Sequence, residues 1–180
     1  MSDHRGTLGV PHGARVQTRG VVFVHSCPRA LCAHVEWALA DVLGGPVSLD
    51  WSAQPVSTGS VRGELSWTGA VGTAARMVST IHGWGRVRFE VTEEATARTE
   101  GERYSVTPSL GIFRAVIGVH GDVVVPEERL RGAVARVALS GAPLEDEIAL
   151  LLGAPWDAEL EPFRFAGDGA SVRWLHQVVS

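Results

Sequence analysis

Lysine and asparagine are absent from this chain of 180 residues, so all sixteen of its basic residues are arginine. Both missing residue types have AT-rich codons, and their absence indicates a GC-rich bacterial genome. The physical consequence is that every permanent side-chain cation is a planar guanidinium group, whose geometry suits carboxylates and phosphates.

A surplus of basic residues is also missing. Residues 1–94 hold eight arginines and eight acidic residues, whereas residues 95–180 hold eight arginines and twelve acidic residues. Proteins that bind nucleic acid carry a basic surface on which their phosphate contacts depend. With a formal net charge of −4, the chain is expected to have no nucleic-acid partner.

Long apolar segments are missing as well. No stretch approaches the ~18 uncharged apolar residues of a membrane helix, so no membrane partner is expected. The first fifteen residues lack the apolar segment of a signal peptide, and we expect residues 1–15 to form a flexible leader of a cytoplasmic protein. Cys27 and Cys32 are the only cysteines, and in a cytosolic chain both are expected to be reduced.

The apolar content of 45% and the charged content of 20% are typical of a globular protein. In the first half, apolar spacing predicts strands at residues 17–25, 47–51, 61–68 and 86–91. Helical spacing predicts one helix from Pro28 to Gly44 and another over residues 71–81. This order predicts a ferredoxin-like βαββαβ unit over residues 16–94.

The second half is expected to be a ββααβ extension over residues 95–180 that packs on the first unit in one compact α+β globule. Strands are predicted at 103–107, 111–119 and 172–179, and helices from Pro126 and from Pro143 to Leu152. Residues 153–169 contain glycines and prolines and are predicted to be irregular.

A ferredoxin-like sheet has helices on one face only, so its other face needs water or a cover. Alternation places a mixed set of residues on that face, apolar in the middle and charged at the flanks: Arg19, Val21, Phe23, His25, Arg62, Glu64, Arg86, Arg88 and Glu90. The C-terminal half, a ligand or a partner protein are three alternatives for the cover.

Residues 25–34 concentrate the side chains that most often carry chemistry. One interpretation is a zinc site of His25, Cys27, Cys32 and His34, although Cys32 and His34 would lie about 200° apart on a helix. A second is a nucleophilic Cys27 at a helix N-terminus with His25 or His34 as its base. The third, which we favour, makes Cys32 a small core residue, Cys27 a helix cap and the histidines polar surface residues.

The arginines of the open sheet face, Arg19, Arg62, Arg86 and Arg88, form a candidate site for an anionic small molecule, with Arg29 as a further candidate. The alternative is a set of cross-strand ion pairs with Glu64 and Glu90, each contributing under about 1 kcal/mol.

Trp156 lies in the segment predicted to be irregular. It either fixes this segment to the core or anchors an interface with another protein. No phosphate-binding loop and no serine nucleophile motif occurs, and no cofactor is expected.

The segment Val22-Phe23-Val24-His25-Ser26-Cys27-Pro28-Arg29-Ala30-Leu31-Cys32-Ala33-His34-Val35-Glu36-Trp37-Ala38-Leu39 resembles a family of uncharacterised actinobacterial proteins that carries a domain-of-unknown-function label. The tail Val172-Arg173-Trp174-Leu175-His176 is similar to it as well. The resemblance covers nearly the whole chain and implies a housekeeping role linked to type II fatty-acid synthesis genes. It implies no catalytic or binding residues.

The first hypothesis for function is a non-catalytic binding or regulatory accessory protein, whose partner is another protein or a second copy of the chain. The alternative is a small enzyme that acts on an acyl or phosphorylated substrate through Cys27 and His25. A structural zinc protein is the second alternative. The absence of a recognisable catalytic motif favours the first hypothesis.

Overall fold

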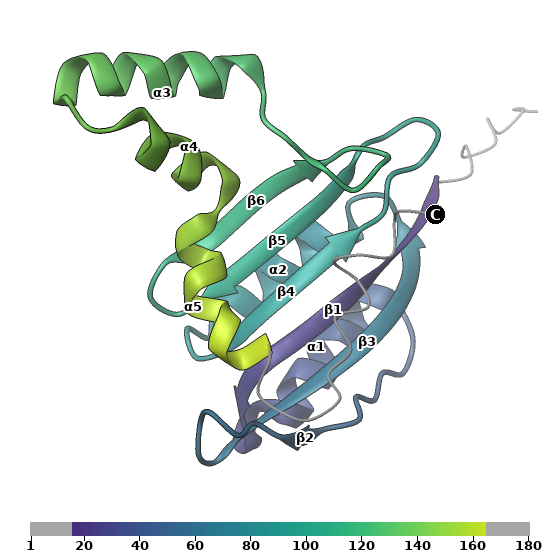
Figure 1. Ribbon diagram of the computed structural model, residues 1–180. Coiled ribbons are helices and arrows are strands. Elements are labelled where there is room, and N and C mark those ends of the chain that lie inside the picture. Colours follow the sequence, from purple (N-terminus) through teal and green to yellow (C-terminus); the bar gives the residue numbers. More distant parts are fainter. Residues whose placement is uncertain (1–15, 165–180) are drawn as a thin grey trace, which may run out of the picture.

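The computed structural model describes residues 16–164 and contains a seven-stranded antiparallel sheet in the order β2-β3-β1-β4-β5-β6-β7 (Figure 1). The strands are β1 (Gln17–Pro28), β2 (Ser52–Ala53), β3 (Ser60–Ala70), β4 (Arg88–Glu93), β5 (Gly101–Thr107), β6 (Gly111–Ile117) and β7 (Val123–Val124). The helices are the short 3-10 helix η1 (Arg29–Leu31), α1 (Cys32–Leu43), α2 (Thr73–His82), α3 (Glu127–Ser140), α4 (Leu144–Leu152) and α5 (Ala154–Arg164).

The main core lies between one face of the sheet and the helices α1 and α2 (Figure 1). Successive residues of a strand point to opposite faces, and Val22 and Val24 of β1 point to this inner face, where both are fully buried. Leu39 of α1 and Met77 of α2, each at helical spacing from other apolar residues, are fully buried in the same cluster.

Two expected boundaries in the first half were wrong. The first strand continues to Pro28, so α1 begins at Cys32 instead of Pro28. The strand expected at residues 47–51 is absent, and β2 contains only two residues, Ser52 and Ala53. The reason is visible at Glu36 of α1, whose carboxylate accepts hydrogen bonds from the Leu49 amide at 2.8 Å and the Trp51 indole at 3.0 Å. These contacts hold the segment against a helix.

The second half continues the same sheet. Strand β5 pairs with β4, with Phe89 opposite Val106 and Glu90 opposite Ser105, and β6 pairs with β5. The expectation of an irregular segment from 153 to 169 was wrong for residues 154–164, which form α5. Pro155 occupies the first turn of α5, where a missing amide hydrogen costs no helical hydrogen bond. The strand predicted at 172–179 and the leader predicted at 1–15 lie outside the described residues.

The C-terminal helices differ in their contact with the sheet. Helix α5 crosses the face opposite α1 and α2, whereas the α3–α4 hairpin (residues 127–152) projects beyond the sheet (Figure 1). Leu160 of α5 is fully buried. In α3 the one buried residue is Ala133, and in α4 it is Leu151. The cover of the open sheet face is therefore partly supplied by α5.

Candidate functional site

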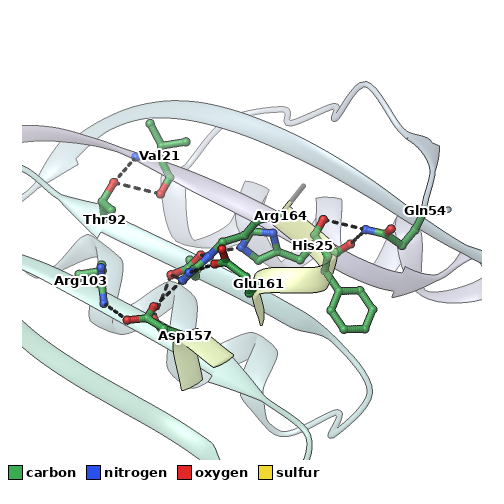
Figure 2. A network of polar contacts seen from close by, with 11 residues as sticks. Val21, His25, Gln54, Thr92, Arg103, Asp157, Glu161 and Arg164 are labelled. Carbon is green, nitrogen blue, oxygen red and sulfur yellow. Dashed lines mark hydrogen bonds and ion pairs between the residues drawn. The ribbon is translucent and has the colours of Figure 1, made fainter. Parts of the chain in front are cut away.

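A polar cluster lies beneath α5 on the outer face of the sheet, and we call it the Glu90 cluster (His25, Glu90, Arg103, Ser105, Asp157 and Arg164). Three neighbouring strands supply its floor: His25 from β1, Glu90 from β4, and Arg103 and Ser105 from β5. Asp157 and Arg164 reach it from α5 (Figure 2). Alternation along each strand brings these side chains to one face, because residues two apart share a face.

Glu90 is the centre of the cluster and accepts hydrogen bonds from three side chains. The Nε2 atom of His25 lies 2.6 Å from Oε2, and the Ser105 hydroxyl donates to Oε1 at 3.0 Å. Arg164 donates from Nε to Oε2 at 3.0 Å and from Nη2 to Oε1 at 2.7 Å, which is a bidentate pair. Both carboxylate oxygens are thus occupied, in a side chain that is 1% exposed.

A second ion pair extends the cluster toward the outer strands. Nη2 of Arg164 also donates to Oδ1 of Asp157 at 2.8 Å, and Nη2 of Arg103 lies 3.5 Å from Oδ2 of Asp157. Glu161, on the solvent side of α5, lies 3.6 Å from Arg164. The Glu90 carboxylate is 1% exposed and is balanced by the Arg164 guanidinium, which is the condition under which a charge can be kept away from water, whereas the Asp157 side chain is 38% exposed.

Burial and hydrogen bonding set the charge states at the centre. Burial lowers the pKa of His25 and outweighs the opposite effect of Glu90, so His25 is neutral. Burial by itself would raise the pKa of Glu90, but hydrogen bonds from His25 and Arg164 outweigh it and lower the pKa to about 2. A neutral His25 donates its Nε2 proton to Glu90, and its Nδ1 atom has no hydrogen-bond partner within the described residues.

Gln54 connects this cluster to the loop between β2 and β3. Its side-chain amide donates to the backbone carbonyl of His25 at 2.6 Å and to that of Phe163 at 3.3 Å (Figure 2). One side chain therefore holds β1 and the C-terminal end of α5 together. The cluster contains an acid, a base and two cations, but the side chains of His25 and Glu90 are each 1% exposed. The arrangement holds α5 on the sheet, and neither side chain can reach a substrate while α5 lies there.

The cysteines lie on the other side of the sheet from the Glu90 cluster, in the main core. Cys27 is fully buried, and its thiol donates a weak hydrogen bond to the Pro28 carbonyl at 3.4 Å. Burial, together with the neighbouring Cys32, raises the pKa of Cys27 to about 12, and burial also raises the pKa of Cys32. A thiol with a raised pKa is protonated at neutral pH, so this geometry does not favour a nucleophilic Cys27.

The four side chains suggested for zinc occupy different surroundings. His25 contacts Glu90, the two cysteines adjoin each other, and the His34 ring lies 5.4 Å from that of Trp37 and 6.5 Å from that of Trp84. Among residues 16–164, no three histidine, cysteine or acidic side chains come together in a way that could hold a metal ion.

The five candidate anion-binding arginines are dispersed. Arg19 lies near one end of β1 and pairs with Glu94 at 2.6 Å, with both side chains largely exposed. Arg88, near the other end of the sheet face, donates to Glu159 of α5 at 3.1 Å and lies 4.8 Å above the Phe163 ring. Arg62 contributes to the electrostatic environment of His25.

Arg29 in η1 and Arg86 before β4 are both exposed. The N-terminus of a helix favours an anion, and at the start of α2 the chain supplies one itself. The carboxylate of Glu93 accepts hydrogen bonds from the amides of Gly72 at 2.8 Å and Ala74 at 3.0 Å.

Trp156 belongs to α5 and packs on the edge of the sheet. Its indole donates to the Gly111 carbonyl at 3.1 Å, and its ring lies 5.2 Å from the Phe113 ring. These contacts fix α5 to β6.

Sequence reasoning placed His25 and Glu90 on the open face but missed Asp157 and Arg164 as their partners. The signal that could have found them is the i, i+3 and i, i+4 spacing of Asp157, Leu160, Glu161 and Arg164, which is typical of one helical face.

Residues 21–177 match the family described as "Protein of unknown function (DUF3145)", and the chain belongs to this family. No curated protein and no solved structure matches the chain. Within residues 16–164, every helix is too short or too polar to cross a membrane. The actinobacterial source, the link with fatty-acid synthesis and the cytoplasmic location stay predictions.

Proposed function

We propose that this DUF3145 protein is a non-catalytic binding protein that docks a protein partner on its α3–α4 hairpin. The observation that carries the proposal is the distribution of exposed apolar side chains. Of the fifteen large apolar side chains exposed in the described residues, seven lie between residues 130 and 152: Leu130, Val134, Leu139, Leu144, Ile148, Leu150 and Leu152. An exposed apolar surface concentrated on one projecting element is typical of a protein–protein contact.

The apolar side chains of the hairpin are exposed, whereas the candidate catalytic side chains are buried. This contrast supports a binding role over an enzymatic one. Catalysis needs an acid or base that can reach the proton of a substrate. Glu90 and His25 lie 2.6 Å apart, and both are 1% exposed and bonded to the protein. Cys27, the candidate nucleophile, is fully buried. The enzymatic alternative would need α5 to leave the sheet.

Two finer hypotheses accompany this proposal. The strand order β2-β3-β1-β4, with antiparallel neighbours and α1 and α2 on one face, supports a ferredoxin-like interpretation of the first half. That fold serves many functions, so it does not identify the partner. An accessory role in fatty-acid or acyl metabolism rests on the family resemblance alone.

A site-specific crosslinking experiment tests the proposal. A photo-crosslinking amino acid is placed at position 134 of α3 or, as the matched control, at the exposed position 82 of α2. We expect irradiation of living cells to give one covalent product of reproducible mass from position 134 and none from position 82. We also expect Ile148→Arg to abolish this product while Leu139→Arg leaves it. Equal products from both positions, or no product from the hairpin, would contradict the proposal.

Thiol reactivity tests the enzymatic alternative. At pH 7 we expect iodoacetamide to modify Cys27 in the native protein at least about a hundred times more slowly than in urea, because the thiol is buried and protonated. Intact-protein mass spectrometry followed by peptide mapping separates Cys27 from Cys32. Rapid modification of native Cys27 would favour the enzyme hypothesis.

A further inference from the structure

Helix α5 crosses the outer face of the sheet strand by strand, from β6 toward β1 (Figure 1). Trp156, in its first turn, is bonded to β6. Arg164, its last residue, pairs with Glu90 of β4, and Gln54 links the backbone carbonyl of Phe163 to that of β1. The chain therefore leaves α5 at β1, and β3 is the next strand of the sheet.

The outer face beyond the end of α5 is formed by β1 and β3. Val21 and Phe23 of β1 are half-buried apolar residues, and their partners across the strand pair, Ser66 and Glu64 of β3, are exposed. We call these four residues the β1–β3 face. Apolar side chains in the middle of a polar sheet surface are typical of a surface that another segment covers.

A buried polar atom lies where α5 ends. His25 and Arg164 bond to the same carboxylate, that of Glu90. The His25 side chain is 1% exposed, and its Nδ1 atom has no hydrogen-bond partner among residues 16–164. Buried polar atoms in proteins generally have a partner. A backbone amide of the residues that follow Arg164 would supply one.

The segment that follows α5 has the length and composition to cover the β1–β3 face. It contains the sixteen residues 165–180, with one acidic and one basic residue. At about 3.3 Å per residue it spans up to roughly 50 Å, whereas a strand of the length of β1 spans about 40 Å. Six of its side chains are large and apolar: Phe165, Val172, Trp174, Leu175, Val178 and Val179.

Two further observations favour this segment over a separate molecule. The match to the DUF3145 family includes residues 165–177 but not residues 1–20, so most of the segment belongs to the sequence that the family shares. The segment is also tethered at Arg164, beside the face. A short tether gives an effective concentration of about the millimolar range, which a separate partner would have to exceed.

We infer that residues 165–180 pack on the β1–β3 face, with their apolar side chains against Val21 and Phe23, and continue the cover that α5 begins. This inference is independent of the proposed function, because the hairpin precedes the first turn of α5 and the β1–β3 face lies at its last turn. It assigns the cover of this face to the chain itself, so that a ligand or a partner protein is excluded from it.

Intramolecular crosslinking of the purified full-length chain tests the inference. A photo-crosslinking amino acid is placed at position 66, which is exposed on β3, or, as the matched control, at the exposed position 79 of α2 on the other side of the sheet. We expect irradiation to join position 66, but not position 79, to residues 165–180, as identified by peptide mapping. An equal mixture of unlabelled and isotope-labelled chains should give products within one chain only. No product from position 66, equal products from both positions, or products that join two chains overturn the inference.

Hydrogen exchange followed by mass spectrometry provides a second test. We expect the amides of residues 172–179 to exchange at least about tenfold more slowly in the full chain than in a synthetic peptide of residues 165–180. Phe23→Ser or Val21→Ser should bring the exchange to within about threefold of the peptide, whereas Val134→Ser, which changes an exposed side chain of α3, should leave it slow. Circular dichroism checks that each variant is folded. Exchange of the wild-type segment at the rate of the peptide, or slow exchange that persists in both β1 variants, overturns the inference.

Discussion

Helix α5 and the α3–α4 hairpin are adjacent in the sequence but have opposite surroundings. On α5, Leu160 is fully buried and the Arg164 side chain is 9% exposed, whereas on α3 Leu139 is 90% exposed. Helix α5 gives its apolar and charged side chains to the sheet, and the hairpin keeps most of its own at the surface. The comparison teaches that α5 belongs to the folded core of the protein, while the hairpin presents an exposed apolar surface, on which the proposed docking of a partner depends.

The largest expected effect comes from removing the buried cation of α5. Arg164→Met should lower the free energy of unfolding by about 3–5 kcal/mol, because Glu90 then remains buried without its bidentate partner. Arg131→Met on α3 is the matched control: its partner Glu127 is exposed, and the loss should stay within about 0.5 kcal/mol. Urea unfolding followed by circular dichroism measures both values. Equal losses would mean that α5 is no better anchored than the hairpin.

The next largest difference in the free energy of unfolding is expected between alanine variants of two glycines, each of which follows one of two neighbouring helices. Gly153, after α4, has φ +88°, and a Cβ atom added there would lie 2.4 Å from the Phe113 ring; Gly141, after α3, has φ +71° with open space around it. Both alanine variants incur the strain of left-handed backbone, about 1–2 kcal/mol. Gly153→Ala also displaces Phe113, so its total loss should be about 3 kcal/mol by urea unfolding. Similar losses for the two variants would contradict the close packing at Phe113.

The side chains that β1 and β4 give to the Glu90 cluster could be predicted from the sequence, but those that α5 gives to it could not. Period-two alternation placed His25 and Glu90 on one face, because that pattern is local and strict along a strand. Arg164 is 74 residues from Glu90, and no local pattern links the two positions. Pro155 and Pro162 also favoured an irregular segment over α5, although the first proline suits an initial helical turn and the second is accommodated inside the helix.

The strand expected at residues 47–51 failed for a related reason. Its apolar residues are buried as predicted in the case of Leu49, but the backbone is held by a carboxylate from α1. Local propensity describes which residues prefer the interior. It does not describe which side chain of a distant element will bond to the backbone, and here the carboxylate of Glu36 bonds to residues 49–51 in place of a neighbouring strand.

The pH dependence of stability separates the buried cluster from the exposed surface. The pKa of His25 is lowered in the folded state, so the unfolded chain takes up its proton first as the pH falls below about 6.5. Stability should therefore fall by up to about 1.4 kcal/mol per pH unit from that point. Below about pH 4.5, Glu90 adds to the loss, because its folded pKa is about 2.

Two variants test whether His25 causes the loss of stability that begins near pH 6.5. His25→Gln should remove the component that begins near pH 6.5, whereas His82→Gln, at an exposed position on α2, should retain it. Urea midpoints measured between pH 8 and pH 5 give the two slopes. A slope that persists in His25→Gln would show that another group carries the proton uptake.

The smallest effect is expected at the most exposed apolar side chain of the comparison. Leu139→Ser should change the free energy of unfolding by less than about 0.5 kcal/mol, because a side chain that is 90% exposed loses almost no burial when it is shortened. Urea unfolding measures the change, and a loss above about 1 kcal/mol would contradict the exposed position of Leu139.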